Sequence, residues 1–569
     1  MTSIFTFLHR QSNPLPYLLS RAILPCAALV SCSVPSMPPT PLPEQQAYSA
    51  PHIIRDERTV TIESGAIEGI LAGNVLSFKG IPYAAPPLGD RRWRAPEPPA
   101  AWTAVRKTTA FAHDCMQMVE QKAGISADTS PSEDCLVLNI WRPAEFTGEK
   151  PFPVLLWIHG GAYITGGSSN PLYDGSAFAR RGIVFVSVNY RLGRFGFFAH
   201  PALISAAEGP VGNYAYMDLL AALKWIQRNI AAFEGDPNQV TLAGESAGGD
   251  AVLHLLTSPR AKGLFQRAVV MSGGGRVPLL GDIPLTGGTA RQPSADQIGV
   301  NFALTTGITG LGPDALHGLR NLPADRIKGN LSFTHLIDTS SKLPTYVKGA
   351  IVDGTIVSGS PGDLFSRRQV TAMPLLIGTT CRELSITVPP SKDLPLAYFG
   401  SNARRARAAY ARDSLIQPDE LYAAISMDAT MQEPARFAAG QNLQAGKPTW
   451  LYRFCYAAQS VRAKGLPARH GSELAFAFDR LVVRYGEEAT DADRAMAKAF
   501  NTYLANFVKS GDPNDLNLPT WPVFNPVTSE LMIFTQHHGP ITMPDPWKER
   551  LDLIMEAADG NRARSEIRR

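Results

Sequence analysis

The sequence has little of what marks several common protein classes. Its net charge is only +4 over 569 residues, and it contains no long basic run with interleaved aromatic residues, so nothing favours a nucleic-acid groove. We find no internal repeat and no heptad run, which excludes a solenoid and a coiled coil. Cysteine is scarce, at 6 residues, and no C-x-x-C pair or histidine-rich cluster indicates a metal site. With 44% apolar and 18% charged residues, the composition is that of a globular protein with an ample core.

The N-terminal region predicts export. After Arg21 comes AILPCAALVSC, an apolar stretch of about ten residues that suits a signal peptide and is too short to span a bilayer as a helix. It ends in Leu29-Val30-Ser31-Cys32, which resembles the bacterial lipobox, where a signal peptidase cuts before a lipid-bearing cysteine. An ordinary secretory signal, cut nearby among small residues, is the alternative. Residues 1–31 are therefore interpreted as a signal peptide of one of these two types.

A proline-rich tether is expected to follow. Residues 32–55 are rich in proline and poor in large apolar residues, which is typical of an extended spacer without packed structure. A lipid on Cys32 followed by such a spacer would hold the remaining domain, residues 56–569, off a membrane surface. Both interpretations of the signal place this domain outside the cytoplasm, in the cell envelope, the periplasm or the medium.

The other cysteines agree with export. Cys115 and Cys135 bracket a polar loop, which in an oxidising compartment indicates a local disulfide. Cys381 and Cys455 each follow a predicted strand. They form a second disulfide if the two strands are neighbours, and a pair of buried free thiols is the alternative.

Strands and helices alternate from Thr59 onward. PVLLWIH and IVFVSVNY are nearly continuous apolar runs rich in β-branched residues, which favour strands buried on both faces of a parallel sheet. TVTIESGAIEGI and VLSFKGIPYA resemble antiparallel hairpins with glycine turns. Residues 216–233 have helical periodicity and end before Gly235, and the strand QVTLAG follows. This order predicts an α/β fold with parallel strands joined by a right-handed crossover.

One serine stands where a strand gives way to a helix. In LAGESAGGD, residues 242–250, Ser246 follows the strand VTLAG and precedes the predicted helix DAVLHLLTS. The pattern G-x-S-x-G is weak alone, but strand, sharp turn and helix together are typical of a nucleophile elbow. The flanking glycines permit a strained turn that projects the hydroxyl clear of the sheet, and the helix directs its N-terminal N–H groups at the reacting carbonyl. Ser246 is therefore predicted to be a nucleophile.

A serine hydroxyl needs a base and an orienting carboxylate, because it is a weak nucleophile until its proton is removed. In folds with this elbow the chain order is serine, acid, histidine. His470 is the best candidate base, because ARHGSEL forms a polar loop after the apolar strand WLYRF. Four other histidines that follow Ser246 in the chain lack such a setting and are expected at the surface, namely His317, His335, His537 and His538.

Several long, ordered motifs together resemble the type-B carboxylesterases, an α/β-hydrolase family that includes the cholinesterases and bacterial broad-range esterases. The resemblance runs from about Val60 to Phe534 and is carried by FKGIPYAAPP, SEDCLVLNIW, WIHGGAYITGG, NYRLGRFGF, GNYAYMD, NIAAFEGDP, GESAGG, RHGSELAFAF and NFVKSGDPN. It implies the α/β-hydrolase fold: a mostly parallel central sheet flanked by helices, with helical insertions covering an active-site gorge. Residues 274–346 and 385–442 have weak periodicity and are expected to form that cover.

The resemblance also assigns a Ser-His-Glu triad. It places the acid on Glu383 and the base on His470, with Ser246 as the nucleophile. Family members usually read Asp-Glu-Gly at the acid, whereas this chain has Arg382-Glu383-Leu384. The alternative acids are Asp353 and Asp479.

Further residues follow from the same resemblance. A tetrahedral oxyanion needs preorganised N–H donors, and HGGA is a glycine-rich loop after a strand. The family pattern puts these donors on Gly161, Ala162 and, after the nucleophile, Ala247. Glu245 and Ser272 resemble polar residues of the family that do not react with the substrate themselves and that lie next to the catalytic residues.

Two more pairs match family motifs. Cys115 and Cys135 match a disulfide that closes a loop over the active-site mouth. Arg191 and Asp218 are expected to form a buried ion pair that holds loops near the elbow.

These observations favour a serine hydrolase that cleaves small-molecule carboxylic esters through an acyl-enzyme, with no metal or organic cofactor. An amide or carbamate hydrolase would use the same groups. A non-catalytic binding module is a further alternative, because the family includes members that kept the fold and lost the catalytic residues. Four residues either line an acyl or alcohol pocket or belong to the core, namely Phe333, Tyr398, Phe399 and Met427.

Overall fold

The computed structural model describes residues 58–118, 130–146, 148–276, 280–289, 292–333, 335, 343–385, 394–414 and 417–567. The predicted signal peptide and tether, and with them Cys32, lie outside these residues and stay predictions. No helix in the described part is long and apolar enough to cross a membrane.

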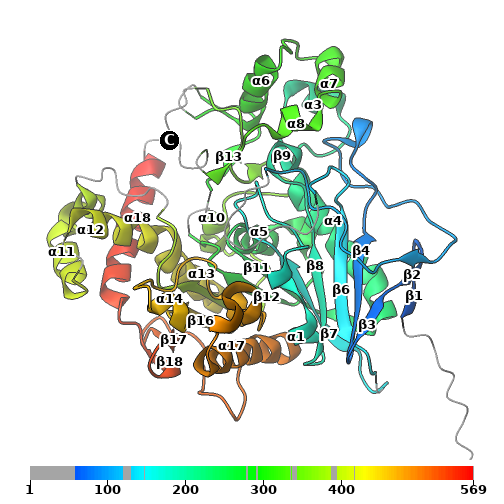
Figure 1. Ribbon diagram of the computed structural model, residues 1–569. Coiled ribbons are helices and arrows are strands. Elements are labelled where there is room, and N and C mark those ends of the chain that lie inside the picture. The colour runs from blue at the N-terminus through cyan, green and yellow to red at the C-terminus, as the bar shows by residue number, and fades with distance from the viewer. Residues whose placement is uncertain are drawn as a thin grey trace, which may run out of the picture. The chain divides into compact units, whose positions relative to one another are not determined.

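A sheet of 11 strands forms the centre of the fold (Figure 1). From one edge to the other its strands are β18 (Gly539–Pro544), β17 (Glu530–Thr535), β16 (Thr449–Phe454), β15 (Leu375–Thr380), β12 (Arg267–Met271), β11 (Gly235–Glu245), β7 (Phe152–Ile158), β8 (Val184–Val188), β6 (Val137–Pro143), β4 (Val75–Pro82) and β3 (Ile70–Ala72). The strands from β17 to β8 pair in parallel, and the outer pairs are antiparallel. The predicted mostly parallel sheet is thereby confirmed.

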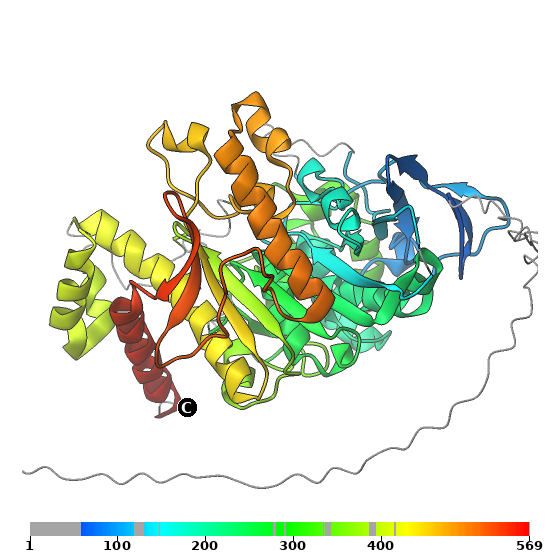
Figure 2. The same cartoon turned by 90° about the horizontal axis from the view of Figure 1, so that it is seen from below.

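Both faces of the central strands are buried, as their continuous apolar runs predict. Successive residues point to opposite faces, so Leu156 and Leu242 belong to one core cluster, and their neighbours Leu155 and Ala243 to another. The first cluster includes residues of the helices α4 (Tyr214–Asn229), α5 (Ala247–Thr257) and α13 (Glu433–Gln444). The second includes residues of α1 (Ser176–Ala179) and α17 (Asp491–Ser510), the long orange helix that crosses one side of the sheet in Figure 2. Helices thus flank both faces of the sheet.

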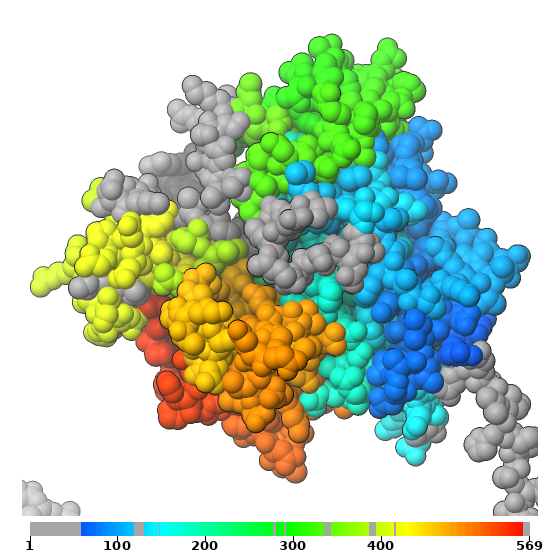
Figure 3. Space-filling model, viewed as in Figure 1, coloured from blue at the N-terminus to red at the C-terminus, as the bar shows by residue number. Residues whose placement is uncertain are grey.

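The segments expected to form a cover contain further helices that lie away from the sheet. They are α6 (Ala295–Thr305), α7 (Pro313–Arg320) and α8 (Ala324–Lys328), then α11 (Ala403–Arg412) and α12 (Pro418–Met427). In the view of Figure 3 the first group, in green, and the second, in yellow, occupy separate parts of the surface. The second group packs on α18 (Lys548–Ile567) around its own core, which contains Phe399 and Met427. Of the two interpretations of these residues, core packing is therefore the one the structure supports.

Two disulfides join the cysteines of the described part. Cys115 bonds to Cys135, and Cys381 bonds to Cys455. The second bond is possible because the preceding strands, β15 and β16, are paired neighbours, which is the condition that the sequence left open. Disulfides of this kind agree with an oxidising compartment outside the cytoplasm.

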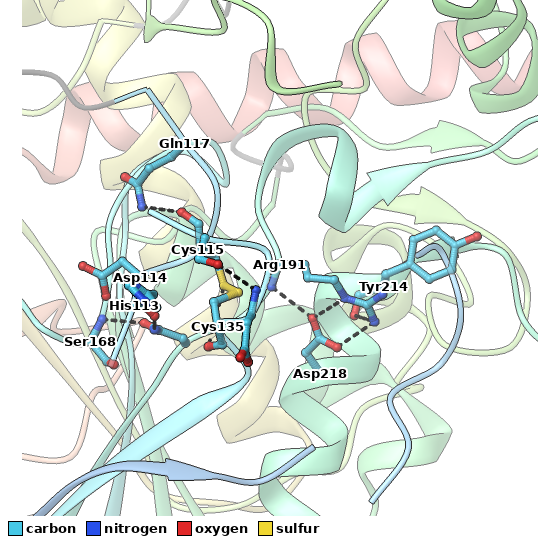
Figure 4. Close-up of a disulfide and its surroundings, with 12 residues drawn as sticks. His113, Asp114, Cys115, Gln117, Cys135, Ser168, Arg191, Tyr214 and Asp218 are labelled. Carbon is cyan, nitrogen blue, oxygen red and sulfur yellow. Dashed lines mark hydrogen bonds and ion pairs between the residues drawn. A yellow bond between two sulfur atoms is a disulfide. The ribbon is translucent and has the colours of Figure 1, made fainter. Parts of the chain in front are cut away.

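The predicted ion pair lies close to the first disulfide (Figure 4). Arg191 Nη2 is 2.7 Å from Asp218 Oδ1, and both side chains are buried. The backbone N–H of Arg191 also donates to Asp218 Oδ2, at 3.0 Å. Because one carboxylate binds both the backbone and the guanidinium of the same residue, it fixes the start of the loop that follows β8.

Candidate active site

Ser246 stands on a strained turn between β11 and α5. Its φ of 57° and ψ of −124° are rare for a residue with a side chain and persist only where the surroundings enforce them. The flanking glycines provide the space. A Cβ on Gly244 would lie 2.4 Å from the carbonyl carbon of Gly248, and one on Gly248 would lie 2.1 Å from the backbone oxygen of Ile158. The turn therefore needs both glycines of the G-x-S-x-G pattern, and its backbone has the form of the predicted elbow.

Glu383 and His470 meet between two loops that follow neighbouring strands. The backbone N–H of His470 donates to the oxygen of Arg382, at 2.9 Å, and holds the loops together. His470 Nδ1 donates to Glu383 Oε2, at 2.5 Å, and the side chain of Glu383 is 0% exposed. A bond at Nδ1 fixes the tautomer of the ring and leaves Nε2 as the atom that can accept a proton.

Three donors hold the other oxygen of Glu383. Ser272 Oγ donates to Oε1 at 2.6 Å, and the N–H and hydroxyl of Thr380 do so at 2.7 and 3.0 Å. Ser272 thus contacts the carboxylate, as its supporting position predicts. Leu384 follows without a positive φ, so the loop does not need the conformational freedom of the glycine that the family pattern has there.

The two alternative acids lie elsewhere. Asp353 Oδ1 accepts the backbone N–H groups of Thr355, Ile356 and Val357 and so closes a turn. Asp479 lies just after the short helix α15 (Leu474–Ala477). Neither Asp353 nor Asp479 contacts His470 in the described part of the chain.

Two more buried carboxylates surround the imidazole. Glu245 Oε1 lies 3.3 Å from His470 Nε2. Glu473 Oε1 accepts a longer bond from Ser272 Oγ, at 3.4 Å, and its side chain is fully buried. Glu473 was not predicted from the sequence, although it stands three residues after His470 within the motif RHGSEL. A carboxylate so close to a proposed base in the sequence was the available signal.

Burial and the neighbouring charges together shift the pKa values of Glu245, Glu473, Glu383 and His470. Burial raises the pKa of Glu245 to about 7, against the opposing effect of His470. Burial and the neighbouring carboxylates raise the pKa of Glu473 to about 8. Burial would also raise the pKa of Glu383, but the charge of His470 and the hydrogen bonds to the carboxylate outweigh it and hold the pKa below its ordinary value. For His470, burial lowers the pKa, and the surrounding carboxylates more than reverse that effect and raise it.

The loop after β7 supplies unpaired N–H groups. Gly161 has a φ of 107°, and a Cβ there would lie 2.1 Å from the backbone oxygen of Thr165, so only glycine fits. Among the described residues, no acceptor pairs with the backbone N–H of Gly161, Ala162 or Ala247, and the last of these opens α5. Free N–H groups at a glycine-rich loop and a helix N-terminus suit a developing negative charge.

This loop lies directly against the elbow. A Cβ on Gly160 would come within 3.0 Å of Ser246 Cβ and 2.7 Å of Glu245 Oε2. Nearby, Phe333 packs against a small apolar cluster that contains Ala162 and Tyr346. The loop, the elbow and the Glu383–His470 pair all follow the carboxyl ends of central parallel strands, which is where ligands bind in open α/β sheets.

Two features complete the geometry. His470 Nε2 has no hydrogen-bond partner in the described part of the chain. The hydrogen bond between a catalytic base and the group whose proton it takes is often long in an unliganded enzyme, and it shortens when the substrate binds. Within the same part, no three His, Cys, Asp or Glu side chains are arranged to hold a metal ion.

Comparison with known proteins identifies the family. A model described as the carboxylesterase family matches residues 56–543. The fumonisin B1 esterase of Sphingopyxis macrogoltabida is 34% identical over 493 residues, which cover 84% of this chain and 86% of that protein. The para-nitrobenzyl esterase of Bacillus subtilis (strain 168) is 32% identical over 491 residues, 83% of this chain and 94% of that protein. A solved structure of a PNB esterase has a TM-score of 0.73 at 30% identity and covers 88% of this chain and 99% of that one. The chain therefore belongs to the carboxylesterase family and is a carboxylic-ester hydrolase with the α/β-hydrolase fold.

Proposed function

We propose that this hydrolase works through an acyl-enzyme on Ser246, with His470 as its base and Glu383 as the acid that orients the base. The observation that carries the proposal is the 2.5 Å bond from His470 Nδ1 to the buried Glu383. It leaves Nε2 3.3 Å from Glu245, the residue before Ser246, and without a hydrogen-bond partner among the described residues. This is the arrangement that a serine hydroxyl needs in order to lose its proton to a neutral imidazole.

The reaction proceeds in two halves. Ser246 Oγ attacks the ester carbonyl as His470 Nε2 takes its proton, and the negative oxygen of the tetrahedral intermediate accepts hydrogen bonds from Gly161, Ala162 and Ala247. His470 then gives the proton to the leaving alcohol, and an acyl group stays on the serine. In the second half His470 takes a proton from water, which attacks the acyl carbonyl. His470 then returns this proton to Ser246 Oγ as the carboxylic acid leaves.

Ester hydrolysis is tested with p-nitrophenyl acetate and its amide counterpart, p-nitroacetanilide. We expect rapid hydrolysis of the ester and a turnover of the anilide that is lower by orders of magnitude. A kcat/KM for the anilide equal to that for the ester would contradict the preference for esters, although an amidase would use the same three residues. A series of p-nitrophenyl esters of rising acyl length then measures the size of the acyl pocket. The best-placed candidate to line it is Phe333, which lies beside the loop after β7 that carries Gly161 and Ala162, hereafter the oxyanion loop.

The cluster of carboxylates predicts the direction of a pH shift. His470 must be neutral to act as a base, so kcat/KM rises as pH increases through the pKa of its imidazole. Glu245 is one of the carboxylates that raise this pKa. Replacing Glu245 by glutamine removes a negative charge next to Nε2, so the acid limb of the kcat/KM profile is expected to move to lower pH by about one unit. The measurement is the pH profile for p-nitrophenyl acetate.

A second substitution serves as the control for that shift. Glu473 acts more weakly on His470 than Glu245 does. Glu473→Gln is therefore expected to move the acid limb in the same direction and by less. An acid limb that stays in place in Glu245→Gln, or that moves to higher pH, would contradict the assignment of this limb to His470.

We also propose that the domain is exported and attached to a membrane by lipid on Cys32. The support is the resemblance of Leu29-Val30-Ser31-Cys32 to a lipobox, followed by the proline-rich spacer. The full chain is expected to enter the detergent phase on Triton X-114 partition, and Cys32→Ala is expected to stay in the aqueous phase. If Cys32→Ala still partitions with detergent, the lipid is not on this residue.

A further inference from the structure

A buried hydrogen bond connects the oxyanion loop to the helix of the nucleophile. Tyr163, next to Ala162 in the loop, donates its hydroxyl to Asp250 Oδ2, at 2.8 Å. Asp250 lies one turn into α5, and the two residues are 0% and 2% exposed. The hydroxyl also lies 2.9 Å from that of Tyr216. In a buried environment such a bond is strong, and breaking it removes a hydrogen bond from both Tyr163 and Asp250.

A cationic side chain lies beside Asp250. His254, also on α5, lies 3.5 Å from Asp250 Oδ2 through Nδ1, and 3.3 Å from Asp282 Oδ1 through Nε2. Its Nδ1 donates to the backbone oxygen of Asp250, at 2.9 Å. Burial would lower the pKa of His254, but the two aspartates outweigh it and raise the pKa to about 9, so the imidazole is charged at neutral pH. A cation between two carboxylates compensates the buried charge that Tyr163 binds.

The loop needs such an anchor because its backbone is strained. Ala162 and Tyr163 have φ values of 54° and 59°, in succession and without glycine. Residues with side chains persist in this region only when contacts on several sides enforce it. At Tyr163 the carbonyl accepts the N–H of Gly193, at 2.7 Å, and the hydroxyl binds Asp250. One hydrogen bond thus holds the side chain of Tyr163, and another holds its backbone.

The position of this bond gives it a specific consequence. Gly161 and Ala162 lie on the loop, whereas Ala247 lies at the start of α5, so the proposed oxyanion donors belong to two separate elements. Tyr163 follows Ala162 directly, and Asp250 follows Ala247 within one turn. The bond between Tyr163 and Asp250 therefore joins the two elements that carry the donors, close to both groups.

We propose that Asp250 and Tyr163 are positioning residues of this esterase. They hold the oxyanion donors of the loop at the correct distance from the donor at the start of α5. The proposal rests on the proposed function, since it takes Ser246 as the nucleophile and the three N–H groups as donors. Misplacing such donors weakens binding of the tetrahedral oxyanion and leaves binding of the ester ground state nearly intact.

The test compares Tyr163→Phe and Asp250→Asn with the unmodified enzyme. We expect kcat for p-nitrophenyl acetate, per active site titrated by the burst of p-nitrophenol, to fall by about ten- to a hundredfold, with KM nearly unchanged. Affinity for an aryl trifluoromethyl ketone, which forms a tetrahedral adduct with the serine, is expected to fall by the same factor. The double variant is expected to lose no more than the worse single variant, because both changes remove one bond.

A matched control exists in the outlying helices. Tyr410 is also fully buried, and its hydroxyl donates to Asp428 Oδ2 at 2.9 Å. Tyr410→Phe removes the same kind of bond far from Ser246 in the sequence, and it is expected to keep both kcat and ketone affinity. Tyr163→Phe removes one oxygen atom from a buried ring, so it provides the test even if Asp250→Asn fails to fold.

The outcomes separate the inference from the proposed function. If Tyr163→Phe keeps kcat per active site and ketone affinity while Ser246→Ala is inactive, the positioning role is overturned and the nucleophile stands. If Tyr163→Phe lowers only the number of active sites or raises only KM, its hydroxyl serves stability or ground-state binding, and the inference is again overturned. Activity in Ser246→Ala would overturn the proposed function itself.

Discussion

Replacing Ser246 by alanine is expected to lower kcat for p-nitrophenyl acetate by about 10⁵- to 10⁶-fold. Only the hydroxyl group is removed, so the strained turn and the N–H groups of Gly161, Ala162 and Ala247 stay in place. Without the nucleophile no acyl-enzyme forms, and the burst of p-nitrophenol disappears. A residual rate above that of the uncatalysed reaction is expected, because the oxyanion donors and the binding site still act on the ester.

Ser258 provides the matched control for this loss. It ends the same helix, is buried, and its hydroxyl has no hydrogen-bond partner in the described part of the chain. Ser258→Ala is therefore expected to retain the activity of the unmodified enzyme. An active Ser246→Ala variant would show that hydrolysis does not depend on the elbow.

Replacing Glu383 by glutamine is expected to lower kcat by about 10⁴-fold, although the new side chain has the same shape. The reason lies in the hydrogen bonds at each oxygen. Oε1 accepts three bonds, from Ser272 and Thr380, so the amide oxygen of glutamine must take this place. The amide NH₂ then faces His470 Nδ1 as a donor. The imidazole has to move its proton to Nε2, where it can no longer accept the proton of Ser246.

The two alternative acids serve as controls in the same assay. Asp353→Asn and Asp479→Asn are each expected to keep kcat within about threefold of the unmodified enzyme, because neither residue contacts His470 in the described part of the chain. A large loss in one of these variants, together with an active Glu383→Gln, would move the role of the acid to that residue.

Much of the site was predictable because its parts have strong local signals. The elbow requires Gly244 and Gly248 around Ser246, and this demand leaves a pattern that can be read in the sequence. His470 follows from the chain order of the fold and from its polar loop. The parallel strands were predictable from their apolar runs, since burial on both faces removes the alternation of polar and apolar residues.

Other features depend on contacts between distant segments and could not be read in the same way. The bond between Cys381 and Cys455 depended on whether β15 and β16 are neighbours, which no local pattern states. The core positions of Phe399 and Met427 depend on α18, more than a hundred residues later in the chain. The link from Tyr163 to Asp250 likewise joins a loop and a helix 87 residues apart.

The central claim is that the acyl group of the substrate passes through Ser246. The most direct measurement is mass spectrometry of peptides after reaction with a p-nitrophenyl phosphonate, which leaves a stable adduct on an activated serine. We expect one equivalent of p-nitrophenol released per chain, loss of hydrolysis in the same proportion, and the adduct on the peptide that contains GESAGG. Complete inhibition with the adduct on another residue, or sustained hydrolysis after Ser246 is fully modified, would contradict it.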